Sequence, residues 1–167
     1  MSAVIIRPEE ADDEAAIRSL LVAAFKGEAE AGLVDALRRA DDVVLSLVAE
    51  RTGEIRGHIL FSRLLVRTGE EAFPAVALAP LAVHPDHQKE GIATALMDDA
   101  HLRLQNRGEL LSLVLGEPAF YGRFGYSRER AQGFDSIYQG EFLQALAWGE
   151  APSTGRLEYP AAFADLA

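Results

Sequence analysis

The sequence contains no cysteine and only four histidines. The missing cysteine excludes disulfides, thiolate nucleophiles and cysteine-ligated metal sites, and it fits a reducing compartment. His84 and His87 flank Asp86, but this short cluster offers too few ligands at a convincing spacing for a metal ion. His58 and His101 have the pattern of solvated or core-edge side chains. We therefore expect no metal.

Basic residues are also scarce. Lysine and arginine total 16 against 26 aspartate and glutamate, which gives a net charge of −10. Nucleic-acid binders neutralise phosphates with basic patches, so we expect no nucleic-acid partner. An acidic surface either serves solubility or attracts cationic partners such as protonated amines.

Long hydrophobic runs are absent as well. No apolar run reaches the ~20 residues of a membrane helix, so we expect no membrane association. Residues 1–7 lack the basic and then apolar pattern of a signal peptide, which makes the cytoplasm the expected location. The length of 167 residues predicts a single domain over residues 1–167.

The hydrophobic periods predict an α+β (α/β) chain. Strands are expected at 3–6, 43–51, 54–67, 73–83 and 110–115, and helices at 9–25, 33–40 and 91–107. The order strand, helix, strand over 73–115 implies a right-handed crossover and a locally parallel strand pair. Pro80 cannot donate a hydrogen bond within its strand, which predicts a bulge or splaying there.

The turn between Val83 and Gly91 is the sharpest local feature. The first N–H groups of a helix lack partners and carry partial positive charge, which makes such a helix start a phosphate site. Gly91 permits close approach to the backbone, Ala93 keeps the next turn thin, and Lys89 adds a cation at the rim. On its own, however, this feature is weak evidence, because most strand-to-helix loops contain a glycine and bind no ligand.

A second segment, residues 116–126, is rich in aromatic side chains. Such residues favour core packing, although a buried tyrosine hydroxyl needs a hydrogen-bond partner. Tyr121 could protonate a departing thiolate, because the pKa values of phenols and thiols are close.

Together, the two segments resemble the GNAT superfamily of N-acetyltransferases. Its phosphate motif Gln/Arg-x-x-Gly-x-Gly/Ala matches Gln88–Ala93, and its leucine-x-valine strand with a following proline matches Leu81–Pro85. The aromatic-Tyr-x-x-x-Gly-aromatic element matches Phe120–Tyr126. The stretch over 76–126 carries the resemblance, which is nearest to an uncharacterised bacterial subgroup with Tyr-x-Arg-Phe-Gly-aromatic, and the segment 131–167 is divergent.

The resemblance implies a mixed central sheet of about six or seven strands, splayed between the fourth and fifth and flanked by helices. It implies acetyl transfer from acetyl-coenzyme A to a small-molecule or peptide primary amine, by direct attack in a ternary complex, and a homodimer. Tyr121 would be the general acid, and the backbone N–H near Val83 would polarise the thioester carbonyl. The residues implied to bind the cofactor are Leu81, Ala82, Val83, Gln88, Lys89, Glu90, Gly91, Ile92 and Ala93.

The sequence departs from the family pattern at the general base. Neither 76–83 nor 110–115 contains the frequent glutamate, and Gly116–Pro118 replaces a frequent asparagine. The alternatives for removing the proton from the amine are Glu117, a chain of waters, or an acceptor amine whose own pKa is low. The missing glutamate also favours a second hypothesis, in which the protein is a non-catalytic sensor that binds coenzyme A. A third hypothesis is that the protein transfers an acyl group other than acetyl.

Acceptor selectivity in this family comes from regions that correspond here to 25–34 and 131–167. In the first region Glu28 and Glu30 could meet a cationic amine, or could simply form a solvated helix start.

Overall fold

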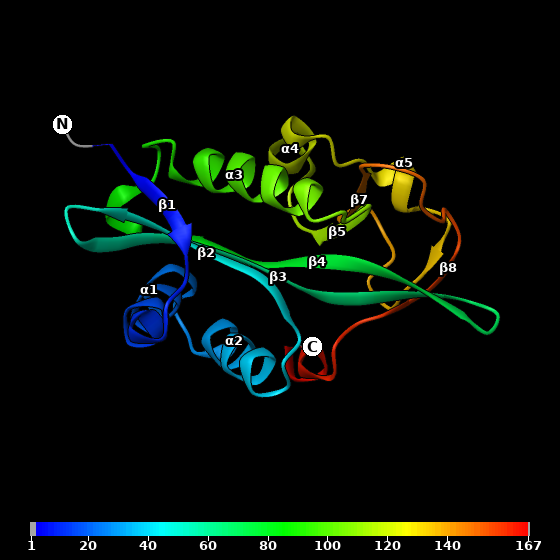
Figure 1. Cartoon of the computed structure of the whole chain (residues 1–167), viewed down its shortest axis with the longest axis horizontal. Helices are drawn as coiled ribbons and strands as arrows, with labels where there is room; N and C mark the ends of the chain where they lie inside the picture. The colour runs from blue at the N-terminus through cyan, green and yellow to red at the C-terminus, as the bar shows by residue number, and fades with distance from the viewer. Residues whose placement is uncertain (1–2, 167) are drawn as a thin grey trace.

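A mixed sheet of eight strands runs through the molecule, with helices against both of its faces (Figure 1). The computed structural model describes residues 3–166. The strands are β1 (Ile5–Pro8), β2 (Val43–Arg51), β3 (Glu54–Thr68), β4 (Glu71–Val83), β5 (Leu111–Leu115), β6 (Phe134–Asp135), β7 (Leu143–Ala147) and β8 (Gly155–Glu158). Their order is β1-β2-β3-β4-β5-β7, while β8 pairs with β3 and β6. The sheet is thus slightly larger than the six or seven strands expected.

Helices form a layer on each face. Figure 1 shows α1 and α2 on one face, together with the C-terminal turn, and α3 on the other. The α-helices are α1 (Glu14–Phe25), α2 (Ala29–Arg39), α3 (Ile92–Asn106), α4 (Pro118–Tyr121) and α5 (Arg128–Ala131). The 3₁₀ helices are Ala11–Asp13, Pro85–His87, Gly122–Phe124 and Ala161–Leu166. Between residues 3 and 166, no helix is long and apolar enough to cross a membrane.

Each face of the sheet buries its own core. Leu21 of α1 and Leu37 of α2 pack with Leu60 in one cluster, and Leu96 of α3 packs with Phe61 in the other. All five side chains have no exposed surface, and burying each contributes about 1.5–3 kcal/mol. The helical spacing of apolar residues in the sequence therefore identified the faces that the helices bury.

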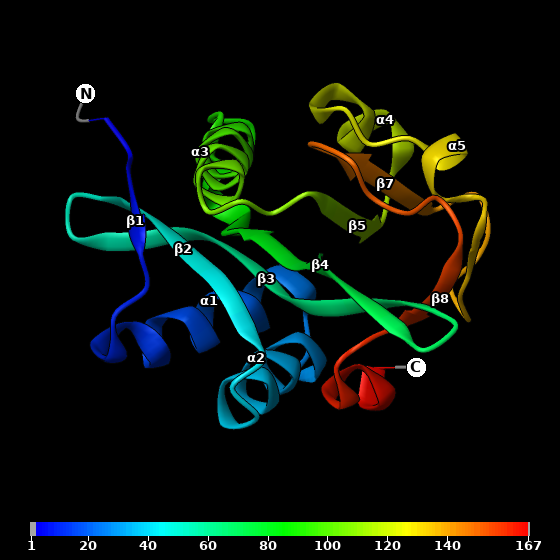
Figure 2. The same ribbon diagram turned by 45° about the vertical axis from the view of Figure 1, so that its right-hand side comes forward.

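The sheet opens along β4. This strand pairs antiparallel with β3 over its length, but it pairs parallel with β5 only from Val76 to Leu78. Its register with β3 shifts so that Leu60 lies opposite both Ala79 and Pro80, which confirms the bulge predicted at Pro80. Beyond that bulge β4 and β5 diverge (Figure 2), as expected for the fourth and fifth strands.

Two histidines correct the sequence analysis, which placed both in solvated or core-edge positions. His58 has no exposed surface and His101 is 8% exposed. His58 Nε2 lies 2.9 Å from Ser46 Oγ, and His101 Nε2 lies 3.1 Å from Tyr126 Oη. Burial lowers the pKa of both rings, that of His101 to about 4. Both imidazoles are therefore neutral core groups at neutral pH.

The His58 cluster fixes the start of the chain against the sheet. Ser46 Oγ donates to Glu9, and Arg38 Nε donates to the same carboxylate at 2.8 Å. Burial alone would raise the pKa of Glu9, but the hydrogen bonds from His58, Arg38 and Ser46 outweigh it and lower that pKa to about 2. This network joins the segment after β1, α2, β2 and β3 on the face of the sheet that α1 and α2 cover.

Candidate functional site

The turn between β4 and α3 has the geometry of an anion site. Gly91 is the N-cap residue of α3 and has φ 82°, a left-handed conformation that favours glycine, and Lys89 has φ 65°. A Cβ added at Gly91 would meet nothing within 4 Å. The backbone at the start of this 15-residue helix is therefore open to a ligand on the outer side of the turn.

A groove of 580 Å³ lies beside this turn. It is lined by Leu81, Val83, Gln88, Lys89, Gly91, Ile92, Ala93, Thr94, Phe120 and Arg123. Seven of the nine residues that the sequence analysis assigned to the cofactor are among them. The other two side chains lie elsewhere: Ala82 is buried in the core, and Glu90 pairs with Arg51 at 3.0 Å.

Three residues of this groove, Thr94, Phe120 and Arg123, were not assigned to the cofactor by the sequence analysis. Arg123 Nη2 lies 3.5 Å from Thr94 Oγ1, and its guanidinium lies 5.7 Å from the centre of the Phe120 ring. Arg123 thus joins Lys89 as a second cation on the groove, although the chain as a whole is acidic. Arg123 was visible within the aromatic motif, but nothing in the sequence placed it near the helix start.

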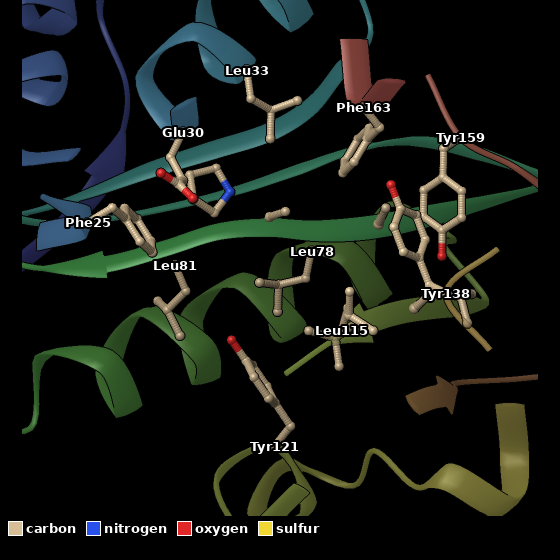
Figure 3. A pocket seen from close by; sticks show the side chains of 15 residues that line it. Phe25, Glu30, Leu33, Leu78, Leu81, Leu115, Tyr121, Tyr138, Tyr159 and Phe163 are labelled. Carbon is tan, nitrogen blue, oxygen red and sulfur yellow. The ribbon is translucent and has the colours of Figure 1, made fainter. Parts of the chain in front are cut away.

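A second cavity, of 340 Å³, lies where β4 and β5 separate (Figure 3). Four parts of the chain form it: the two strands, the α1–α2 region, α4 and the C-terminal segment. Its lining residues are Phe25, Glu30, Leu33, Ala77, Leu78, Ala79, Pro80, Leu81, Leu113, Val114, Leu115, Tyr121, Tyr138, Tyr159 and Phe163. Leu81 lines both the groove and this cavity, so the two meet at β4.

Tyr121 reaches this cavity from α4. Figure 3 shows its hydroxyl directed toward β4 beside Leu81. Burial raises the pKa of Tyr121 to about 12, so the phenol holds its proton at neutral pH. A protonated hydroxyl at the opening of the sheet can donate a hydrogen bond or a proton.

Gly116 leaves the room that the Tyr121 ring occupies. A Cβ at Gly116 would lie 2.5 Å from Tyr121 Cε2. The Gly116 backbone is fixed, because its N–H donates to the carbonyl of Phe142 at 3.0 Å and its carbonyl accepts from Gln144 Nε2 at 3.0 Å. The missing side chain at Gly116 therefore leaves the space in which the tyrosine ring lies.

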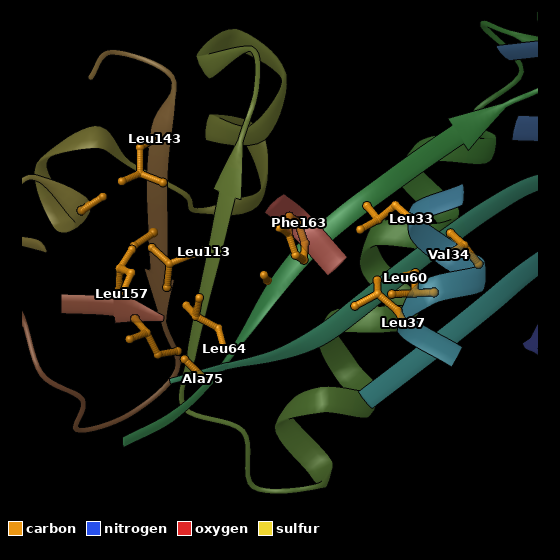
Figure 4. Packing of buried hydrophobic residues seen from close by; sticks show 14 of the residues in the cluster. Leu33, Val34, Leu37, Leu60, Leu64, Ala75, Leu113, Leu143, Leu157 and Phe163 are labelled. Carbon is orange, nitrogen blue, oxygen red and sulfur yellow. The ribbon is translucent and has the colours of Figure 1, made fainter. Parts of the chain in front are cut away.

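The inner wall of the cavity is part of the core. Leu33 and Phe163 belong to the hydrophobic cluster on the α1–α2 face of the sheet (Figure 4). Their side chains are 3% and 7% exposed. Because these residues are packed on their far side, the cavity has a preformed wall rather than a mobile loop.

Carboxylates are sparse around the opening. Glu117, the candidate base nearest in sequence, is an exposed N-cap residue of α4 and lines neither the groove nor the cavity. Among the described residues that line the cavity, Glu30 of α2 is the acidic one. Among the side chains described for residues 3–164, no three His, Cys, Asp or Glu groups are placed together as metal ligands.

Comparison with known proteins identifies relatives over nearly the whole chain. A family model described as an acetyltransferase (GNAT) domain matches residues 5–128. The chain is 34% identical over 164 residues to the uncharacterized N-acetyltransferase YhbS of Escherichia coli K12, which covers 93% of this chain and 96% of YhbS.

Two solved structures have the same fold. The crystal structure of E. coli YhbS in complex with CoA has a TM-score of 0.88 at 30% identity and covers 96% of this chain and 92% of that chain. A GNAT family acetyltransferase from Brucella melitensis, in complex with acetyl-CoA, has a TM-score of 0.82 at 34% identity. That match covers 96% of this chain and 98% of the Brucella melitensis chain.

The close contact at Gly116 leads to a stability prediction. Gly116→Ala should lower the free energy of unfolding by about 1–3 kcal/mol, because the new methyl group overlaps the Tyr121 ring. Gly122→Ala, where a Cβ meets nothing within 4 Å, should change it by less than about 0.5 kcal/mol. Urea denaturation of both variants measures the difference, and equal effects would contradict the proposed overlap.

Proposed function

Because the chain belongs to the GNAT family of N-acetyltransferases, we propose that it moves an acetyl group from acetyl-coenzyme A to a primary amine by direct attack in a ternary complex. The observation that carries this proposal is the opening between β4 and β5. There, a groove at a helix start and a cavity containing a protonated tyrosine meet at Leu81.

The groove suits the coenzyme. We assign the pyrophosphate to the backbone of residues 88–93, with Lys89 and Arg123 supplying positive charge. The pantetheine amides would pair with the backbone of Leu81–Val83, which continues past the last residue that β5 pairs with. The relatives YhbS and the Brucella melitensis enzyme were crystallised with CoA and acetyl-CoA respectively, which supports this assignment.

The cavity suits the acyl transfer. Bound acetyl-coenzyme A supplies an activated thioester carbon. The amine, once it has lost its ammonium proton to solvent, forms a nitrogen–carbon bond to that carbon. The carbon–sulfur bond breaks, the Tyr121 hydroxyl gives its proton to the departing sulfur, and the proton released by the acylated nitrogen passes through solvent to restore the phenol. Burial raises the pKa of the phenol, and it would raise the pKa of a thiol in the same cavity. The two pKa values therefore stay close, which keeps the free-energy change of the proton transfer small.

We place the protein in the cytoplasm and expect a homodimer through the C-terminal segment. Ile137 and Phe142 support the dimer, because their side chains are 86% and 47% exposed although both are large and apolar.

The cofactor assignment predicts a charge-dependent loss of binding. Gly91→Glu should abolish acetyl-coenzyme A binding, because the new carboxylate projects into the groove where the pyrophosphate lies. Isothermal titration calorimetry of the wild type should give micromolar affinity. The matched control is Gly69→Glu, which places the same side chain at a left-handed glycine in the β3–β4 turn. Wild-type protein that binds no acetyl-coenzyme A would contradict the proposed function.

The tyrosine assignment predicts a loss of turnover without a loss of binding. Tyr121→Phe should reduce kcat about 100- to 10,000-fold on a panel of primary amines, because the sulfur loses its proton donor. Acetyl-coenzyme A affinity should stay within about twofold, since the ring remains.

Tyr126→Phe is the matched control for this variant. In the wild type, the buried Tyr126 hydroxyl is hydrogen-bonded to Ser112 and His101, and Tyr126 lines neither the groove nor the cavity. The Tyr126→Phe variant should therefore lose stability and keep turnover. Unchanged turnover in Tyr121→Phe would remove the assigned role. Wild-type protein that binds acetyl-coenzyme A and acetylates no amine would favour the sensor hypothesis.

A further inference from the structure

We infer that the acceptor is a compact apolar monoamine, an arylalkylamine or a branched alkylamine, and that Glu30 binds its ammonium group. This inference rests on the proposed function, because it assigns the acceptor side of the same site. It follows from the one carboxylate among the described lining residues, the aromatic wall opposite that carboxylate, and the small cavity volume.

Among the residues that the structure describes, Glu30 is the acidic group at the start of α2 that forms no ion pair. Its neighbours are engaged with Arg18, which lies 3.3 Å from Glu28 and 2.6 Å from Asp35. Among the described residues, Glu30 forms no such ion pair, and its half-buried side chain lines the cavity. Figure 3 shows its carboxylate directed inward beside Phe25. A partly buried carboxylate without a partner is a site for a cation.

Aromatic rings form the wall on the other side. The rings of Tyr138 and Tyr159 meet edge to face at 5.1 Å, and Tyr159 lies 5.4 Å from Phe163. Burial raises the pKa of Tyr159 to about 12, so the phenol of Tyr159 keeps its proton at neutral pH. Such a surface packs against an apolar or aromatic body.

The charges of the cavity exclude other classes of amine. Its lining residues include no lysine, arginine or histidine, so an acceptor with a carboxylate or phosphate finds no cation. Among the lining residues that the structure describes, a second ammonium group finds no second carboxylate. The volume of 340 Å³ is at the lower end for small-molecule sites, which disfavours large acceptors.

The position of Glu30 relative to Tyr121 suits the reaction. Figure 3 shows Glu30 entering from the α2 side of β4 and Tyr121 entering from the α4 side. An amine bound at Glu30 therefore lies on the side of the opening from which it can reach a thioester carbon placed between β4 and β5.

The test compares matched amines and matched variants. Phenethylamine is compared with phenylalanine, which adds a carboxylate, and with spermidine, an aliphatic triamine. Each amine is assayed with wild type, Glu30→Gln and Glu28→Gln. Glu28 is 75% exposed, pairs with Arg18 and does not line the cavity, so its variant should behave as wild type. Calorimetric titration of phenethylamine into the CoA-saturated proteins gives a readout independent of turnover.

Wild type should prefer phenethylamine to both other amines. Glu30→Gln should weaken phenethylamine binding about 10- to 100-fold and lower kcat/KM to the same extent, because one charge-assisted contact is lost. Acetyl-coenzyme A affinity should be unchanged in Glu30→Gln, which also shows that the variant is folded.

Two results would overturn this inference alone. One is phenethylamine affinity in Glu30→Gln within twofold of wild type. The other is turnover of phenylalanine or spermidine in preference to phenethylamine, which would leave the acetyltransferase function intact. A wild-type protein that does not bind acetyl-coenzyme A would overturn the proposed function, and the inference with it.

Discussion

The bulge at Ala79–Pro80 in β4 is the constraint on which the site depends. Proline has no N–H to donate, and at this point one residue of β3 lies opposite two residues of β4. Pairing with β5 ends at Leu78, just before the bulge. The buried core on both faces of β3 and β4 holds the strands in place, so the sheet stays open there rather than closing.

The opening separates two environments of opposite charge. The groove on the α3 side carries Lys89 and Arg123 beside a helix start, which suits phosphate. The cavity on the α2 side carries Glu30 among apolar and aromatic groups, which suits an ammonium ion. The net charge of −10 is thus an average that hides a local positive site, and Leu81 marks where the two environments meet.

Local patterns in the sequence predicted the parts of this arrangement that depend on nearby residues. The strand before Val83, the turn at Gly91 and the bulge at Pro80 each follow from short-range signals. The burial of His58 did not, because its partners Glu9 and Ser46 come from segments brought together only by folding. The aromatic wall was missed because Tyr138, Tyr159 and Phe163 have no common period, and so nothing distinguished Glu30 from Glu28.

The most direct test of the account is amide hydrogen exchange with and without acetyl-coenzyme A. Binding at the opening should slow exchange at residues 89–93 and at Leu81–Val83, because those backbone groups would contact the ligand. The amides of Phe61 and Ser62 in β3 should be unaffected, since those residues are already paired with both β2 and β4. Protection confined to another part of the molecule, or no protection at residues 89–93, would contradict the account.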